Sequence, residues 1–443
     1  MNENNCLITI VPEISYINET VDITISGLPK NRKVLFRAVS EDYYCINAGM
    51  SEQGQNSQWE SYGVFIADDN GSIQLRNAIP MKGTYEKCNA MGLFYSMKIK
   101  ELHKHKTPQN IQEIPATRNY TVNFTVEVNN QILASKKHIR MFCDEKIKCE
   151  TIIENNFIAR YFTHEKSEKR PAIIVLSGSD GRIEKAQAIS QVFASKGYSA
   201  LAVCYFGLDG TKRNLDRIPL EIIENSIKWL KSKNTVDQNQ IAIYGRSKGG
   251  ELALLAASFF PELTCVIANT PSCYVYEGLK NDMPSRHSSW TYRGNEVPYL
   301  KFSFLILCQM MIRKILGKKD LMTWMYNKII KKGDLNQSSI KVEKINGPIL
   351  LLSSSSDSIW PSLLHCETVI KRLTENNFKF RFKHLSYEKS GHMLTLPYQS
   401  ISTLDKCDGN LEEWAIACVD CWKETIEFLD EWSTANINSV TMV

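Results

Sequence analysis

Short runs in which apolar and polar residues alternate recur through the first 140 residues of the chain. A period of two places successive side chains on opposite faces of a strand, and several short strands separated by turn residues are typical of an antiparallel sandwich. We therefore expect residues 1–140 to form an immunoglobulin-like β-sandwich domain. The predicted strands are 6–12, 20–25, 33–39, 72–75 and 120–128.

The pattern changes at about residue 145, where wholly apolar segments begin to alternate with stretches of helical period. A strand that is apolar on both faces indicates a parallel sheet covered by helices on each side. Residues 145–435 are therefore predicted to form an α/β domain, with an insertion at about 273–345. The first predicted elements are strands 173–176 and 199–203 and helices 186–195 and 219–231.

The segment Ile241-Ala-Ile-Tyr-Gly-Arg-Ser-Lys-Gly-Gly-Glu251 contains the pattern Gly-x-Ser-x-Gly, with Ser247 at its centre. An apolar strand precedes the pattern and an Ala/Leu-rich helix, 252–260, follows it. This strand–turn–helix context is typical of a nucleophile elbow, in which a sharp turn exposes the serine hydroxyl and small residues let strand and helix approach. Ser247 is therefore the candidate nucleophile.

A serine nucleophile needs a base and an orienting carboxylate, and both follow downstream in the order acid, then histidine. Asp357 lies in the polar loop that ends the segment 347–357, after its apolar strand, and His392 lies in the loop after the alternating run 378–385. His384 and His365 are weaker candidates, because one lies inside a strand and the other on a helix. Two further acids, Asp320 and Asp334, are expected in irregular chain within the insertion.

Backbone amides complete such a site by holding the oxyanion that forms when a carbonyl is attacked. Lys248, directly after the nucleophile, supplies one amide. The apolar run 171–176 opens into Ser177-Gly-Ser-Asp-Gly-Arg182, whose small residues allow close approach of a substrate oxygen. The second amide is that of Ser179 or Asp180, and the sequence does not choose between them.

Composition and charge limit the function and the cellular compartment that the sequence allows. The net charge of +5 over 443 residues, without a block of Lys and Arg, argues against nucleic-acid binding. The 13 cysteines are scattered and the first residues are polar, so we expect reduced thiols in a cytoplasmic protein. Cys418 and Cys421 lie three apart on a predicted helix, 411–432, and are interpreted as packing residues. We expect no metal and no cofactor.

Four segments together resemble one known family, the acyl-CoA thioesterases and bile acid-CoA:amino acid N-acyltransferases. They are the elbow Gly245-Arg-Ser-Lys-Gly-Gly-Glu251, Tyr205-Phe-Gly with Ile218-Pro-Leu-Glu221, Met91-Gly-Leu-Phe-Tyr-Ser-Met97 and Ser390-Gly-His392. The resemblance covers nearly the whole chain and implies a β-sandwich followed by an α/β-hydrolase domain. It also implies acylation of the nucleophile by an acyl-CoA thioester, and it maps Ser247, Asp357 and His392 onto the family's triad.

The nucleophile bears on which reaction follows acylation. By resemblance, members that transfer the acyl group to an amino acid carry Cys at the elbow, whereas hydrolytic members carry Ser, as here. We therefore expect a serine acyl-CoA thioesterase of fatty acid and lipid metabolism. A carboxylester hydrolase, an N-acyltransferase and a non-catalytic binding protein remain alternatives, and the oligomeric state is open. Lys248 and Glu251 are expected to form a salt bridge at the elbow.

The chain departs from the family within the insertion, where 299–332 is apolar and basic. The stretch is too short to span a bilayer, and we interpret it as a cap over the active site. Its Met and aromatic residues, especially in 302–312, suit an acyl chain. Two other interpretations stay open: simple packing of the cap on the core, and contact with a membrane surface through 302–332.

Overall fold

The computed structural model describes residues 6–48, 57–102, 107–154, 157–166, 168–281, 283–401 and 411–440, with side chains to residue 435 in the last segment. The chain divides into two compact units. Unit 1 comprises 1–107, 117–144 and 395–422, and unit 2 comprises 108–116, 145–394 and 423–443. Two segments thus lie across the predicted boundary, because 108–116 belongs to unit 2 and 395–422 to unit 1.

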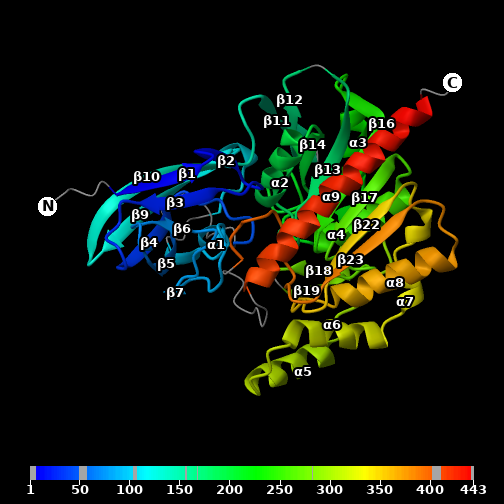
Figure 1. Ribbon diagram of the computed structural model, residues 1–443. Helices are drawn as coiled ribbons and strands as arrows, with labels where there is room; N and C mark the ends of the chain where they lie inside the picture. Colours follow the sequence, from blue (N-terminus) through cyan, green and yellow to red (C-terminus); the bar gives the residue numbers. More distant parts are fainter. Residues whose placement is uncertain are drawn as a thin grey trace. The chain divides into compact units, whose positions relative to one another are not determined.

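Unit 1 is built from two sheets of mostly antiparallel strands (Figure 1). Each of the five strands predicted in the first 140 residues is confirmed, and the burial of β4 alternates along its whole length, as its sequence pattern requires. The smaller sheet has the order β1(Leu7–Val11), β3(Asp22–Ser26), β6(Ile73–Gln74). The larger has the order β2(Ile14–Tyr16), β10(Gln131–Met141), β9(Asn119–Val128), β4(Lys33–Ser40), β5(Gln58–Ile66), β7(Lys82–Gly83), and β8(Lys98–Glu101) also pairs with β5. A short helix, α1(Gly92–Tyr95), is buried in this unit.

The largest sheet of unit 2 has eight strands among the described residues. Its first two pairings, β11 with β12 and β12 with β14, are antiparallel, and the five that follow are parallel. The order across the sheet is β11(Ile147–Glu154), β12(Phe157–His164), β14(Ser199–Cys204), β13(Arg170–Leu176), β16(Val236–Arg246), β17(Leu263–Asn269), β22(Ile349–Ser354), β23(Phe382–Tyr387). The crossover helices are α2(Ile183–Ser195), α3(Glu221–Lys231), α4(Lys248–Phe259) and α8(Ser362–Glu375), and α9(Leu411–Val440) ends the described chain.

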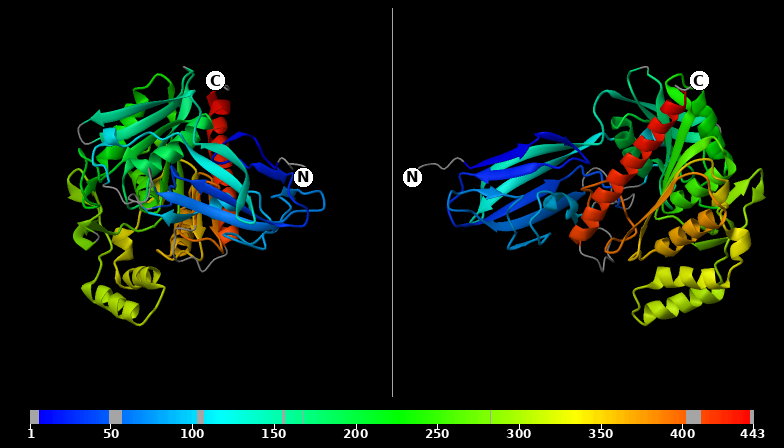
Figure 2. Two further views of the ribbon diagram at one scale, coloured as in Figure 1. Left: turned by 90° about the vertical axis from the view of Figure 1, so that its left-hand side faces the viewer. Right: turned by 45° about the vertical axis from the view of Figure 1, so that its right-hand side comes forward.

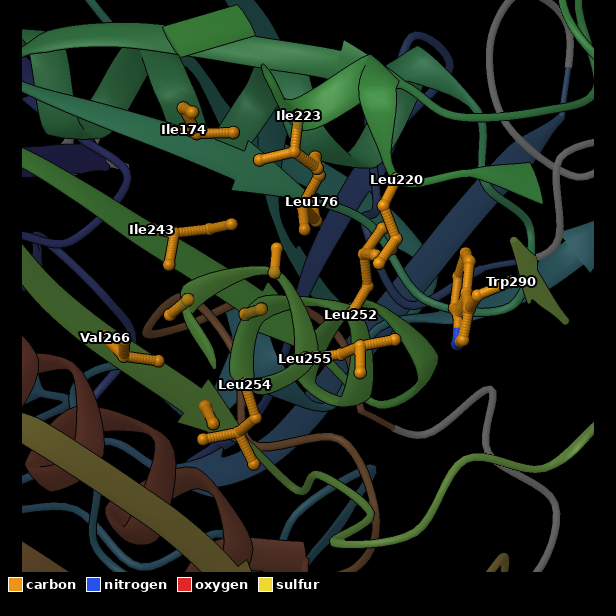
Figure 3. Close-up of a cluster of buried hydrophobic side chains, with 14 of the residues drawn as sticks. Ile174, Leu176, Leu220, Ile223, Ile243, Leu252, Leu254, Leu255, Val266 and Trp290 are labelled. Carbon is orange, nitrogen blue, oxygen red and sulfur yellow. The ribbon is translucent and has the colours of Figure 1, made fainter. Parts of the chain in front are cut away.

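Helices cover both faces of this sheet, which explains why its strands are apolar throughout. On one face, side chains of β13 and β16 such as Ile174 and Ile243 pack with α3 and α4 in a single buried cluster (Figure 3). On the other face, Phe193 of α2 makes an edge-to-face contact with Tyr244, with 5.5 Å between ring centroids. The neighbouring residues Ile243 and Tyr244 of β16 therefore pack into two separate cores, one on each face of the sheet.

The insertion between β17 and β22 is largely ordered into short strands and helices. It contains β18(Glu277–Lys280), β19(Met283–Ser288), β20(Trp290–Tyr292), β21(Asn295–Glu296), α5(Phe304–Ile315), α6(Leu321–Lys332), α7(Leu335–Ser338) and the 3₁₀ turn η3(Val342–Lys344); β20 also pairs with β15(Ile218–Pro219). The insertion is therefore more regular than expected, although Asp320 and Asp334 themselves lie outside helices and strands. Asp320 directly precedes α6, and the Asp334 carboxylate caps α7 by accepting from two backbone amides, a role for which short polar residues are preferred.

Within the described ranges, the structure holds no helix whose length and apolar content would let it cross a membrane.

Candidate active site

Ser247 lies at the turn between β16 and α4, as the elbow pattern predicts. Its backbone has φ 57° and ψ −120°, a conformation that costs a non-glycine residue energy and is fixed here by a hydrogen bond from its amide to Asn269 O at 2.8 Å. The glycines are required by close approach. A Cβ on Gly245 would lie 1.9 Å from Gly249 O, and one on Gly249 would lie 1.9 Å from Ser177 O.

The structure brings Ser247, His392 and Asp357 together from three loops of unit 2. Ser247 Oγ is 2.7 Å from His392 Nε2, and His392 Nδ1 is 2.8 Å from Asp357 Oδ2. The histidine and aspartate are buried, whereas the serine is partly accessible. With the imidazole proton on Nδ1, His392 donates to the carboxylate and its Nε2 can accept the serine proton, which is the arrangement that activates a hydroxyl nucleophile.

Asp357 is held by its own loop, which follows β22. Its Oδ1 accepts hydrogen bonds from the amides of Ile359 at 2.9 Å and Trp360 at 3.2 Å, so Oδ2 is directed to His392. Its main-chain oxygen accepts from the hydroxyl of Thr323, which lies on α6. Every oxygen of Asp357 therefore has a partner, and the carboxylate is fixed in one orientation.

The loop that carries His392 is held by the end of β17. Thr270 Oγ1 donates to His392 O at 3.1 Å, and the Asn269 side chain donates to Leu394 O at 2.6 Å. The Trp360 indole donates to Thr270 O at 3.0 Å, and its ring packs edge-on against the His392 imidazole. Sequence reasoning missed these supports. The available signal was Asn269-Thr270-Pro271, a polar exit from the strand beside the elbow strand.

The rival residues are engaged elsewhere. His384 pairs with Ser353 Oγ at 2.8 Å within the sheet. His365 is buried on α8 beside Cys273 and Tyr276, and burial lowers the pKa of its imidazole to about 3. Asp320 forms an ion pair with Arg313, and Asp334 caps α7.

The loop after β13 approaches Ser247 closely, because a Cβ on Gly178 would lie 3.5 Å from Ser247 Cβ. A hydrogen bond from Gly181 N to Gly178 O closes a turn whose central residues are Ser179 and Asp180. The amides of central residues do not take part in the bond that closes a turn. The Asp180 carboxylate pairs with Lys185 at 2.9 Å; burial opposes its ionisation, but Lys185 and Arg246 outweigh burial and lower the pKa of the Asp180 carboxyl.

Comparisons with known proteins agree with this architecture. Residues 18–154 match the family model described as acyl-CoA thioester hydrolase/BAAT N-terminal region, and residues 218–434 match the one described as BAAT/acyl-CoA thioester hydrolase C terminal. The chain belongs to this family. The family prediction is thus confirmed, as is an α/β-hydrolase fold with a β-rich N-terminal unit.

Named relatives within the acyl-CoA thioesterase/BAAT family include both hydrolases and transferases. Mouse acyl-coenzyme A thioesterase 1 is 22% identical over 93% of this chain and 93% of its own length. Mouse acyl-coenzyme A amino acid N-acyltransferase 1 is 23% identical over 94% of this chain and 95% of its own length. Among solved structures, the chain is similar to a puromycin-hydrolysing peptidase from Mycobacterium tuberculosis. The superposition covers 85% of this chain and 52% of the peptidase, at 12% identity and a TM-score of 0.45.

This family member has a buried ion pair directly after Ser247 in the chain. Lys248 Nζ lies 2.6 Å from Glu251 Oε1, and the Trp290 indole donates to the same oxygen at 2.7 Å. The expected salt bridge is therefore confirmed. Burial lowers the pKa of Lys248 and raises the pKa of Glu251, so removal from water outweighs mutual attraction for both partners.

Aromatic rings connect the insertion to the acid loop. Tyr326 of α6 packs edge-on against Tyr276 at 4.9 Å and Trp360 at 5.7 Å between centroids. Trp360 in turn packs against His392. The helix α6 thus contacts Trp360, which bonds to Asp357 and packs against His392, whereas in α5 only Ile306 is buried.

Proposed function

We propose that the protein is a serine acyl-CoA thioesterase that hydrolyses an acyl-CoA thioester to the free acid and CoA. The observation that carries this proposal is the pair of hydrogen bonds that links Ser247 Oγ to His392 and His392 to Asp357, with distances of 2.7 and 2.8 Å. These residues lie in a member of the acyl-CoA thioesterase/BAAT family. A hydroxyl beside an imidazole that is oriented by a carboxylate is suited to acyl transfer. We further propose that the protein acts in acyl-chain metabolism in the cytoplasm. The 13 scattered cysteines support a reducing compartment, in which thiols stay free.

In the acylation step, Ser247 Oγ attacks the thioester carbonyl carbon as its proton passes to His392 Nε2. The carbonyl oxygen gains negative charge, which the amide of Lys248 at the start of α4 and the amide of Ser179 or Asp180 would stabilise. When the tetrahedral intermediate collapses, the carbon–sulfur bond breaks and His392 returns the proton to the departing CoA thiolate. An acyl-Ser247 ester remains.

In the second step, water replaces CoA. His392 accepts a proton from the water, whose oxygen attacks the acyl-serine carbonyl, and it then protonates Ser247 Oγ as the ester bond breaks. Asp357 stays ionised throughout and stabilises the imidazolium that forms twice in each cycle. The buried contacts around Asp357 support this role, because they leave Oδ2 directed to the ring.

Transfer of the acyl group to an amino acid is the second candidate, because the named relatives include N-acyltransferases at similar identity. Hydrolysis is favoured by the serine at the elbow, since an acyl-serine ester reacts with water once His392 accepts the water proton, and no acceptor site is needed. Incubation with a long-chain acyl-CoA plus glycine or taurine, with products identified by mass spectrometry, separates the two. We expect free acid as the main product; predominant N-acyl amino acid would establish the transferase instead.

The nucleophile and base are tested with matched variants. Ser247→Ala should lower kcat by on the order of 10⁴-fold or more and abolish labelling by a fluorophosphonate. Ser355→Ala, at an exposed serine in the acid loop, should retain both. His392→Gln should be nearly inactive, whereas His384→Gln should stay active. Labelling and full activity in Ser247→Ala would assign the attack to another residue.

A further inference from the structure

The outer face of α5 is a continuous apolar stripe without a partner among the described residues. Phe304 and Ile315 are 81% and 82% exposed, and Leu316, at the end of the helix, is 68% exposed. Residues at spacings of 1, 4, 7, 8, 11 and 12 share one side of a helix; at 100° per residue the stripe covers an arc of about 140°. Its members are Phe304, Leu305, Cys308, Met311, Ile312, Ile315 and Leu316, all exposed except the half-buried Cys308.

The opposite side of the helix accounts for its packing. Ile306 is buried, and Leu307 and Met310 are partly buried against the core of unit 2. In Figures 1 and 2, α6 lies between α5 and the sheet of this unit, so α5 is the outer helix of the pair. The apolar stripe is therefore a second apolar face of α5, and packing on unit 2 does not require it.

Strong positive charge accompanies the stripe. Residues 301–332 contain eight Lys and Arg and a single Asp, a net charge of +7, whereas the whole chain has +5, so the rest of the chain is slightly acidic. The single acid, Asp320, is already paired with Arg313. Five lysines are exposed on α5, α6 and the turn between them: Lys314, Lys318, Lys319, Lys331 and Lys332.

Apolar side chains lie beside lysines that form no ion pair with the described residues, and this combination suits one kind of partner better than others. In a twofold dimer the same patch faces itself, and these lysines would approach one another. An anionic phospholipid surface accepts both features, because apolar side chains enter the acyl boundary while lysines contact the phosphates. We propose that α5 is an interfacial helix that docks the protein on anionic membranes. This inference rests on α5 and its charges and does not depend on the proposed hydrolysis.

The proposal is tested by sedimentation of the full-length protein with vesicles. We expect binding to phosphatidylcholine vesicles that contain phosphatidylserine, at least about tenfold weaker binding to phosphatidylcholine alone, and weakening by salt. Phe304→Glu with Ile315→Glu should reduce binding at least about tenfold. Ile79→Glu, at an apolar residue 67% exposed on unit 1, is the matched control and should bind like the unmodified protein.

A second variant separates charge from apolar contact. Lys318→Glu with Lys319→Glu should lose most of the preference for phosphatidylserine, with the melting temperature and circular dichroism spectrum unchanged. The proposal is overturned if the unmodified protein does not bind vesicles that contain phosphatidylserine. It is also overturned if the Phe304/Ile315 variant binds them with the same affinity as the Ile79 control. It is equally overturned if the protein is a dimer without lipid and the Phe304/Ile315 variant is a monomer, since a second copy then covers the stripe.

Discussion

Thr323 on α6 donates its hydroxyl hydrogen to the main-chain oxygen of Asp357, with 3.0 Å between the two oxygens. The insertion is thus bonded directly to the residue that orients His392. A lone neutral hydrogen bond contributes about 1 kcal/mol to stability, but a carboxylate that must direct an imidazole is sensitive to small displacements.

We expect Thr323→Val to lower kcat by about fivefold to tenfold, because the acid loop loses one restraint while the volume of the side chain is kept. The melting temperature should change little. Thr374→Val is the control, since Thr374 is exposed on α8 and its hydroxyl donates to Ile370 O of the same helix. Steady-state kinetics measure kcat for both variants. An unchanged kcat in Thr323→Val would show that α6 does not position Asp357.

The buried ion pair of Lys248 and Glu251, next to Ser247, gives a second prediction. Glu251→Gln leaves the ammonium of Lys248 buried without a countercharge, which should lower the free energy of unfolding by about 3–5 kcal/mol. Adding Lys248→Met to Glu251→Gln should recover most of this loss, because no buried charge remains. Urea unfolding of the single and double variants measures both values. Equal stability of the two would mean that the charge on Lys248 is not the cause.

His365 predicts an acid-dependent loss of stability. Its pKa falls from 6.5 to about 3 in the folded protein because burial disfavours the charged imidazole. Below pH 6.5 the unfolded chain therefore binds a proton that the folded chain does not. The free energy of unfolding should then fall by up to about 1.4 kcal/mol per pH unit as the pH decreases from 6.5 toward 3.

His365→Phe keeps an aromatic ring among Tyr274, Tyr276 and Trp360 but cannot be protonated. We expect this variant to be less stable at neutral pH and to lose less stability on acidification. Unfolding curves at several pH values supply the comparison. The same slope in both proteins would contradict a neutral, buried His365.

The two faces of α5 predict different effects on acyl-chain preference. Leu307 faces the core of unit 2 and Leu305 faces outward. If the inner face contacts the acyl chain, Leu307→Asp should depress kcat/KM for long chains more than for short ones. Each lost methylene contact is worth about 0.8 kcal/mol, so three amount to roughly sixtyfold. Leu305→Asp, assayed without vesicles, should show no such dependence, and equal losses at all chain lengths in Leu307→Asp would indicate packing alone.

The sequence by itself determined five strands of unit 1, the elbow, and the three residues that meet in the candidate site. The reason is geometric. Ser247, Asp357 and His392 each follow a strand of a parallel sheet, and the carboxyl ends of parallel strands lie at one edge. The strands β2, β5, β7, β8 and β10 of this unit were missed. In β5 the buried positions include Ser61 and Gly63, so its burial alternates without an apolar pattern, and in β10 only part of Gln131–Met141 is buried.

Only the tertiary structure decided what surrounds these residues. The bond from Asn269 to Leu394 O joins positions 125 apart in the chain, and no local pattern encodes such a pairing. The partner of α5 was likewise undecided by sequence: its apolar residues were interpreted as part of a cap over the active site, with packing on the core and membrane contact as alternatives. A helical period identifies which residues share a face, but the partner of that face is set by the packing of distant elements. The structure turns Ile306 inward and leaves Phe304 and Ile315 exposed.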